Sequence, residues 1–397
     1  MIIILKCLNG MIKTCVENSG LIRLSLFLCI MQLGCIDPVA PEFQFEDDLT
    51  IIEGQASSTV GSSFINIQRT SNEFGIYRNI FQEGAIVTFD NLDSGESVTL
   101  REQIDTYVTP DDFAVATGET WELNVTLTDG STYKSLPETV IAPVPFDDIS
   151  ATFEKELFFR EDSGKFVPGH SIAVSFNEPV ADKNYYLWRF RSFEKLILCK
   201  VCDNSIFRNG DCERNPPPPA VLPVGVPRRA PYYTYGCETP CWTIRYNESI
   251  EILDDKFTNG TFVEEYPAAN IPLYTNENIV VSLEQISLSF DAYQYYRRLQ
   301  DIIDNNGNFD APPPAAVIGN VFNVNDDKEM VLGRFTAASN TVKSIFIERT
   351  DILDDEVDPP PIFSFETDPP IGNPISFAPC IESRFRTGTE PEGWIGN

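Results

Sequence analysis

The chain has 397 residues, and its 59 acidic side chains outnumber the 29 basic ones, which gives a net charge of −30 at pH 7. A chain with this negative charge repels the phosphates of nucleic acids and of anionic lipid headgroups. Neither is therefore expected as a partner. Hydrophobic residues make up 42% of the sequence, enough for ordinary cores, and the length predicts two or more domains.

A short apolar stretch, "LSLFLCIMQLG", runs from Leu24 to Gly34, with Arg23 before it and Cys35 directly after it. A transmembrane helix needs about 20 apolar residues, so a membrane span is disfavoured. A basic flank, a short apolar stretch and small residues at the cleavage site are typical of a secretory signal. The cysteine after Gly34 favours a lipoprotein signal, although Gln32 stands where such signals usually carry leucine. The alternatives are a plain secreted protein and a buried core helix.

We therefore interpret residues 1–34 as a signal peptide whose true start lies after Met1, with Met11 as the candidate. Cys35 is the predicted lipidation site, bearing diacylglycerol and an acyl chain such as palmitate. Each buried methylene contributes about 0.8 kcal/mol, so two or three chains hold a protein on a bilayer without basic residues. Residues 35–48 contain prolines and acids without periodicity, and they are expected to be a tether.

Alternation of apolar and polar residues begins near Leu49 and predicts antiparallel strands. It is clearest in "WELNVTLT" (121–128), and it recurs in "FINIQ" (64–68) and "AIVTF" (85–89). Short strands separated by turn residues predict a β-sandwich of the immunoglobulin or fibronectin kind over residues 49–145. The proline-rich segment "APVPFDD" closes this domain.

A larger, mainly β domain is predicted for residues 146–350. Its alternating segments are 171–176, 184–193, 279–290 and 342–350. One helix is predicted at residues 289–304, with Ser289 as its cap and an apolar stripe formed by Tyr295, Leu299 and Ile302. Residues 351–397 are expected to be a C-terminal segment tied back through Cys380.

Six cysteines follow the anchor, and five of them lie in a proline-rich insert at residues 199–242. They are Cys199, Cys202, Cys212, Cys237, Cys241 and Cys380. An even number of cysteines in an exported chain predicts three disulfides, whose pairing the sequence leaves open. Zinc bound by "CKVC" and "CETPC" is the alternative. A redox pair is weaker, because no thioredoxin-like pattern surrounds the cysteines.

Catalytic motifs are missing from the sequence. Its one histidine, His170, lies beside a glycine turn and is expected to be solvated, and no nucleophile elbow, zinc-protease motif or phosphate loop is present. We therefore predict no catalytic residues, no cofactor and no metal. A glycosidase needs only two carboxylates, so that class stays open. The acidic run at residues 354–356 lacks the spacing of a calcium loop and is interpreted as solvated, with calcium as the alternative.

Aromatic residues are concentrated around the stapled insert, where tyrosine and tryptophan could anchor a partner or stack on sugars. They are Tyr232, Tyr233, Tyr235 and Trp242. Core packing is the alternative reading of the same residues.

Several segments of the mature chain form a recognisable pattern. They are "LTIIEG" (49–54), "EGAIVTF" (83–89), "GETWELNVTLTDGSTYKS" (118–135), "NYYLWRF" (184–190) and a tyrosine-rich helix that leads through prolines to Gly319-Asn320, Gly333 and Phe335. A late cysteine and a near-final tryptophan, Cys380 and Trp394, belong to the same pattern. In these segments the chain resembles a family of Bacteroidota outer-membrane lipoproteins, the domain of unknown function 4249. Arg334 departs from the pattern, which usually has tyrosine there.

The resemblance implies no catalytic residues. It implies service to a TonB-dependent outer-membrane receptor, because such proteins are often encoded beside one. The predicted function is thus a non-catalytic accessory or ligand-capture lipoprotein of the outer membrane, on the cell surface or the periplasmic face. A secreted polysaccharide-binding adhesin or hydrolase on a β-sandwich scaffold is the alternative.

Overall fold

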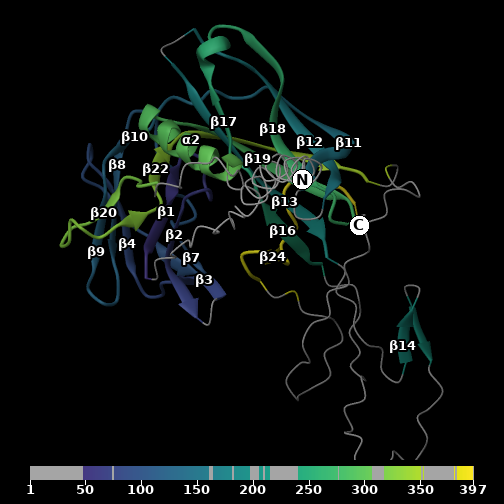
Figure 1. The fold of residues 1–397 in the computed structure, drawn as a ribbon, viewed down its shortest axis with the longest axis horizontal. Coiled ribbons are helices and arrows are strands. Elements are labelled where there is room, and N and C mark those ends of the chain that lie inside the picture. The colour runs from purple at the N-terminus through teal and green to yellow at the C-terminus, as the bar shows by residue number, and fades with distance from the viewer. Residues whose placement is uncertain are drawn as a thin grey trace, which may run out of the picture. The chain divides into compact units, whose positions relative to one another are not determined.

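The computed structural model describes residues 48–349 except 74–75, 161–163, 181–182, 197–204, 209–210, 215–239, 276 and 306–316, and then residues 352, 380 and 382–396. The protein is mainly β, with one α-helix in this described part, which confirms the predicted fold class (Figure 1). The expected signal peptide and nearly all of the expected tether lie outside the described residues. In the described part, no helix is both long and apolar enough to cross a membrane.

The first sandwich consists of two sheets. Sheet A contains β1 (Thr50–Ser57), β2 (Phe64–Glu73), β3 (Ile76–Phe81), β6 (Arg101–Gln103), β7 (Thr106–Val108), β21 (Val331–Leu332) and β22 (Phe335–Ala338). Sheet B contains β4 (Ile86–Asn91), β5 (Ser97–Thr99), β8 (Thr120–Thr126), β9 (Thr132–Ser135), β10 (Glu138–Thr139) and β20 (Val321–Asn323). Their facing side chains, among them Ile52, Ile67, Phe89 and Leu123, form one core.

The second sandwich is built in the same way. Sheet C contains β11 (Asp148–Arg160), β12 (Lys165–Asn177) and β18 (Phe262–Pro272). Sheet D contains β13 (Tyr185–Lys195), β16 (Trp242–Tyr246), β17 (Glu251–Asp254), β19 (Ile279–Ser287), β23 (Asn340–Ile347) and β24 (Arg386–Thr387). Phe176, Trp188, Ile271 and Leu283 belong to the core between the two sheets. A 3-10 helix, η1 (Asp255–Phe257), follows β17, and β14 (Ser205–Arg208) pairs with β15 (Asp211–Arg214) in a separate hairpin.

The predicted helix is present as α2 (Phe290–Asn305), and the side chain of Ser289 caps it by accepting the Ala292 N–H at 3.2 Å. Its packing face differs from the predicted stripe, because Ala292 and Tyr293 are the residues that pack on the outer face of sheet D. Tyr293 stacks on Tyr185 with ring centroids 4.6 Å apart. Of the predicted stripe, Tyr295 is buried, whereas Leu299 and Ile302 are only partly buried.

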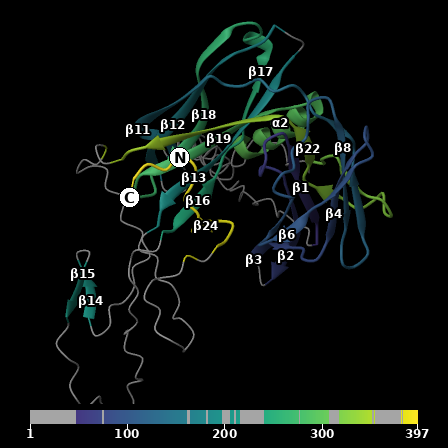
Figure 2. The ribbon, with the colours of Figure 1, turned by 180° about the vertical axis from the view of Figure 1, so that it is seen from behind.

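One segment, residues 335–347, runs through both sandwiches (Figure 2). Its first half, β22, pairs in parallel with β1, and its second half, β23, pairs antiparallel with β19. Only Ser339 separates the two strands. Residues 321–338 therefore belong to the first sandwich, although they lie inside the range expected for the second domain. Strands of two to four residues are too short to show a period in the sequence, which explains the difference.

Two glycines of the family-like motif permit this crossing. Gly333 adopts a positive φ of +90°, and a side chain there would collide with the backbone carbonyl of Ile52. A side chain at Gly319 would collide with the carbonyl of Gly333. The two glycines are thus explained by the close approach of three backbone segments: β1 at Ile52, the segment at Gly333, and the segment at Gly319.

Candidate functional site

Most of the residues singled out in the sequence lie outside the described part of the chain. These are Cys35, Cys199, Cys202, Cys237, Tyr232, Tyr233, Tyr235 and the acidic run at 354–356. Cys212 lies in β15, for which the structure describes the backbone alone. The predictions for these residues stay predictions.

The base of the cysteine-rich insert is described, and it is closed by two links. Cys241 forms a disulfide with Cys380, with the Cα atoms 5.4 Å apart. The Leu196 N–H, at the end of β13, donates to the Cys241 carbonyl at 2.8 Å. Leu196 and Cys241 are both buried there. The two ends of the insert therefore leave sheet D from one fixed place, and the disulfide ties the C-terminal segment to it.

Trp242 corrects one expectation. Its side chain is only 3% exposed, and its ring packs edge-on against Trp394 with centroids 5.8 Å apart. Trp394 in turn contacts Phe346 of β23 at 5.6 Å. Trp242 therefore belongs to the packing that holds the C-terminal segment on sheet D. The sequence suggested Trp242 as a partner contact, but a partner contact needs an exposed ring, so this prediction is wrong for Trp242.

The disulfide can be checked directly. We expect a proteolytic digest made without reductant to contain a peptide pair that joins Cys241 to Cys380, and reduction with alkylation should separate it. Mass spectrometry of the two digests is the measurement. Recovery of Cys241 joined to another cysteine of the insert would contradict this pairing.

The outer face of sheet D, which points away from sheet C, is covered in part by three elements. Helix α2 covers Tyr185 and Leu187 of β13. The first sandwich covers Arg189, whose guanidinium carbon lies 5.6 Å from the Phe64 ring centroid and which also donates to the Gln55 side chain. The C-terminal segment covers the far end through Trp394. Arg191, two residues beyond Arg189 on the same face, is exposed.

Four residues at this point form what we call the Arg191 face: Arg191, Tyr246, Arg384 and Phe385. Arg191 and Tyr246 are direct partners in the β13–β16 pairing. The Tyr246 hydroxyl donates to the Arg384 carbonyl at 2.8 Å, and its ring meets Phe385 edge-on at 6.0 Å. The Arg384 guanidinium carbon lies 5.5 Å from the Tyr246 ring centroid and 5.7 Å from that of Phe385. The Phe385 ring is 58% exposed.

The charges around Tyr246 define the electrostatics of this face. Burial raises the pKa of Tyr246 above its ordinary value, while the positive charges of Arg191 and Arg384 oppose the rise and the carboxylate of Asp105 adds to it. The hydroxyl is therefore a neutral donor at pH 7. Within the described part of the chain, neither Arg191 nor Arg384 forms an ion pair with a carboxylate.

Asp105 reaches the Arg191 face from the first sandwich, in the turn between β6 and β7. Its neighbour Ile104 has a φ of +59° and is 51% exposed. A β-branched residue in the left-handed region is uncommon, so the backbone of this turn is strained. The face thus carries two arginines, two aromatic rings and one nearby acid, drawn from both sandwiches and the C-terminal segment.

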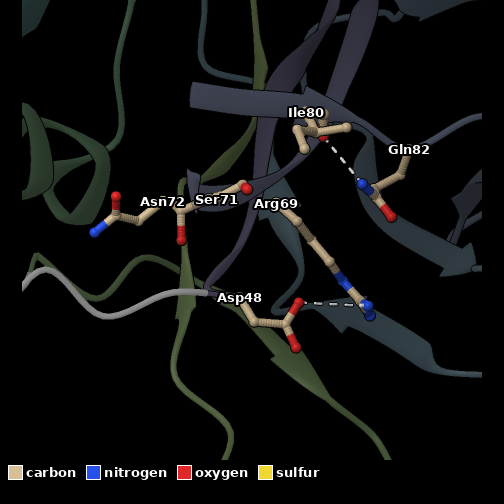
Figure 3. Close-up of a pocket in the computed structure, with 7 residues that line it drawn as sticks. Asp48, Arg69, Ser71, Asn72, Ile80 and Gln82 are labelled. Atoms are coloured by element: carbon tan, nitrogen blue, oxygen red, sulfur yellow. Dashed lines mark hydrogen bonds and ion pairs between the residues drawn. The ribbon is translucent and has the colours of Figure 1, made fainter. Parts of the chain in front are cut away.

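A second candidate is the depression of about 310 Å³ lined by residues of β2 and β3, shown in Figure 3. Its charged groups are already matched, because Arg69 pairs with Asp48 at 3.7 Å and with Asp129 at 2.9 Å. The Gln82 amide donates to the Ile80 carbonyl at 3.0 Å. Two buried atoms of the lining, Arg69 Nε and Asn72 Oδ1, have no hydrogen-bond partner among the described residues, but the depression lacks the exposed aromatic ring of the Arg191 face.

His170 is buried, contrary to the expectation that it is solvated. It lies within β12, is 2% exposed and contacts the Phe153 ring at 5.4 Å. Burial, and secondarily the charge of Arg349, lowers its pKa to about 4. Here the glycine before it stands inside a strand, where a close approach of backbone is made, and the pairing of β12 with both β11 and β18 encloses the ring. His170 has no access to a substrate.

Buried ion pairs are the charged sites that the sequence did not reveal. Glu138 of β10 accepts from Arg334, from the Asn320 amide at 3.1 Å and from the Ser289 hydroxyl at 3.3 Å. Burial raises the pKa of Glu138, and Arg334 opposes the rise. This cluster joins the first sandwich to the start of α2. It also gives a structural role to Arg334, which stands where the family pattern usually has tyrosine.

A second pair lies at one end of sheet D. The Arg349 guanidinium, which is 0% exposed, donates to Glu194 at 2.7 Å, and Arg245 donates to the same carboxylate at 3.1 Å. Arg349 also donates to the backbone carbonyls of Thr275 and Glu277. All of these bonds are made by Arg349 Nη1, whereas its Nε and Nη2 are buried without a hydrogen-bond partner among the described residues. The pair is enclosed by the fold, where a ligand does not reach it. In the described residues, no group of three or more histidine, cysteine or acidic side chains could hold a metal ion.

The comparison with protein families assigns the chain to a known family. The sequence model of a family described as a domain of unknown function, DUF4249, matches residues 36–344. No curated protein matches the chain.

Proposed function

The chain belongs to the DUF4249 family, and we propose that it is a non-catalytic, lipid-anchored outer-membrane protein that captures a ligand for a TonB-dependent nutrient transporter or docks on it. The observation that carries this proposal is the Arg191 face. It presents two arginines that pair with no acid among the described residues, together with an exposed ring. One continuous segment, residues 335–347, contributes a strand to each sandwich, and the buried Arg334–Glu138 and Arg349–Glu194 pairs are enclosed by the fold.

Two features of the sequence support the anchoring part of the proposal. The apolar stretch ends at Gly34-Cys35, and the family match begins at residue 36, immediately after that cysteine. The body begins at Leu49, only a short tether later. The thirteen residues between Cys35 and Leu49 let the chain span at most about 50 Å when extended, so an anchor at Cys35 would keep the body within that distance of the bilayer surface.

Anchoring is tested by Cys35→Ser. We expect the variant either to leave the membrane fraction almost completely or to accumulate as an uncleaved precursor, because the acyl chains provide the attachment. Fractionation followed by immunoblotting is the measurement, and Cys29→Ser, within the signal itself, is the matched control. A Cys35→Ser protein that is still processed and membrane-bound contradicts a lipid anchor at this residue.

The transport role is tested by co-purification. The native lipoprotein, purified from detergent-solubilised outer membrane, is expected to bring a TonB-dependent receptor with it. Replacing Tyr232, Tyr233 and Tyr235 with serine should weaken that co-purification without moving the thermal midpoint if these tyrosines contact the receptor. A preparation that contains no receptor but releases reducing sugar from a polysaccharide would favour the hydrolase alternative.

A further inference from the structure

We propose that the Arg191 face binds a small carboxylate-bearing saccharide, of the uronic acid type, through the guanidinium groups of Arg191 and Arg384 and the ring of Phe385. This assignment rests on the proposed function, because it names the chemical class of the captured ligand. It uses residues that the sequence did not single out as a site.

The positive charge of the face is the first argument. The chain holds 59 acidic and 29 basic side chains, so an arginine that reaches the surface has many carboxylates with which it could pair. Arg69, Arg101, Arg160 and Arg245 do so, whereas the exposed Arg78 and Arg298 have no carboxylate partner among the described residues. What distinguishes the Arg191 face is that two such arginines lie beside the same aromatic residue. Arg191 and Arg384 flank one tyrosine and, among the described residues, pair with no acid. A guanidinium fork matches a planar carboxylate in a bidentate arrangement.

The exposed ring is the second argument. Phe385 is 58% exposed, and beside it Tyr246 has its hydroxyl bonded to the Arg384 carbonyl. An aromatic face bordered by polar groups suits the apolar face of a sugar ring, with the charged substituent turned toward the arginines. An inorganic anion would use the arginines and leave the ring without a role.

The face is also fixed in place, which lowers the entropic cost of binding. The Ile244 N–H of β16 donates to the Phe385 carbonyl at 2.8 Å, and the Ser383 hydroxyl accepts the Phe385 N–H at 3.2 Å. The Cys241–Cys380 disulfide holds the same segment a few residues earlier. Arg384 and Phe385 are therefore held next to Arg191 by pairing on β16.

The size of the ligand follows from the surrounding charge. Asp105 lies close enough to act on Tyr246, and the chain carries a net charge of −30. Charges more than about 8 Å apart are largely screened at physiological salt, so two arginines can attract one carboxylate locally. A long polyanion would extend over the acidic surface and be repelled. The ligand expected here is a monosaccharide or disaccharide.

The test measures binding to the full-length lipoprotein in detergent by saturation-transfer NMR and calorimetry, with D-galacturonate as the probe and D-galactose as its neutral counterpart. Galacturonate is expected to bind at least ten times more tightly than galactose. Arg191→Gln and Arg384→Gln should each weaken galacturonate binding at least tenfold, and Arg384→Lys should restore part of the loss. Asp105→Asn should tighten binding several-fold because it removes a repelling charge.

Arg78→Gln is the matched control, since Arg78 is an exposed arginine on β3 of the other sandwich, and it should leave binding unchanged. The proposal is overturned if galactose binds as well as galacturonate, or if Arg191→Gln binds like the parent protein with an unchanged thermal midpoint. Equal binding of inorganic phosphate and galacturonate would also overturn it. Receptor co-purification with no galacturonate binding refutes the ligand class alone, whereas galacturonate binding without any receptor refutes the transport role.

Discussion

Replacing Arg334 with alanine is expected to lower the free energy of unfolding by about 3–5 kcal/mol, because it leaves Glu138 buried without its charge partner. The two side chains are 5% and 7% exposed and meet in a direct ion pair. Asn320 and Ser289 still donate to the carboxylate, but neutral donors replace only part of a full positive charge. Urea unfolding followed by tryptophan fluorescence measures the change.

Two further variants decide what the loss means. Adding Glu138→Gln to Arg334→Ala removes the stranded charge, so the double variant should be more stable than the single one. Arg297→Ala breaks an exposed pair with Asp301 on α2 and should cost no more than about 0.5 kcal/mol. If Arg334→Ala is as mild as Arg297→Ala, the pair contributes little and the interpretation of this junction is wrong.

Acidification is expected to destabilise the protein through His170, by up to about 3 kcal/mol between pH 7 and pH 4. Burial lowers the pKa of His170 from 6.5 to about 4 in the folded chain. Between pH 6.5 and pH 4, therefore, His170 is mostly protonated in the unfolded chain and mostly neutral in the folded chain. The stability that neutral His170 contributes is fully present above pH 6.5 and is lost progressively as the pH falls toward 4.

His170→Phe isolates this contribution, because phenylalanine keeps a ring beside Phe153 and cannot titrate. Burial also raises the pKa of Glu138, Glu178 and Glu277, which acts in the opposite sense, but these groups are present in both proteins and cancel in the difference. Unfolding free energies at pH 7.5, 6, 5 and 4.5 are the measurement. A difference between parent and variant that stays constant with pH would show that His170 titrates normally.

Regular elements with one buried face could be predicted from the sequence. Trp121, Leu123 and Val125 alternate with more polar residues, and all three are buried in β8. Even there, Glu122 is buried as well, because it pairs with Lys134 across the sheet at 2.7 Å. The alternation of apolar and polar residues indicates which face of a strand is apolar. It does not indicate that a polar residue is buried through an ion pair with another strand.

Elements whose burial depends on distant partners could not be predicted. In β13 the residues Tyr185 and Leu187 are as buried as Tyr186 and Trp188, because α2 covers the second face of sheet D. The apolar stripe assigned to α2 was right for the buried Tyr295 but wrong about which residues pack on sheet D. Small and aromatic residues in its first two turns meet the sheet, while the more hydrophobic Leu299 and Ile302 lie farther along the helix.

The candidate site shows the same limit. The sequence directed attention to the cysteines and tyrosines of the insert, which are close together in the chain. The Arg191 face combines residues from β13, β16 and the C-terminal segment, separated by up to nearly 200 positions. Arg384 and Phe385 follow Cys380, so the terminal cysteine was the one available signal that this segment returns to sheet D.

The segment that contributes a strand to each sandwich, residues 335–347, sets an order of assembly. Gly54 of β1 pairs with Phe335 of β22, so the N-terminal sandwich cannot be completed until the chain has been synthesised beyond residue 338. Contacts so remote in sequence form slowly, because a long loop must close before they contribute any stability. Until then the free edge of β1 can pair with other chains. A protein built in this way depends on protection from aggregation while its own C-terminal half arrives.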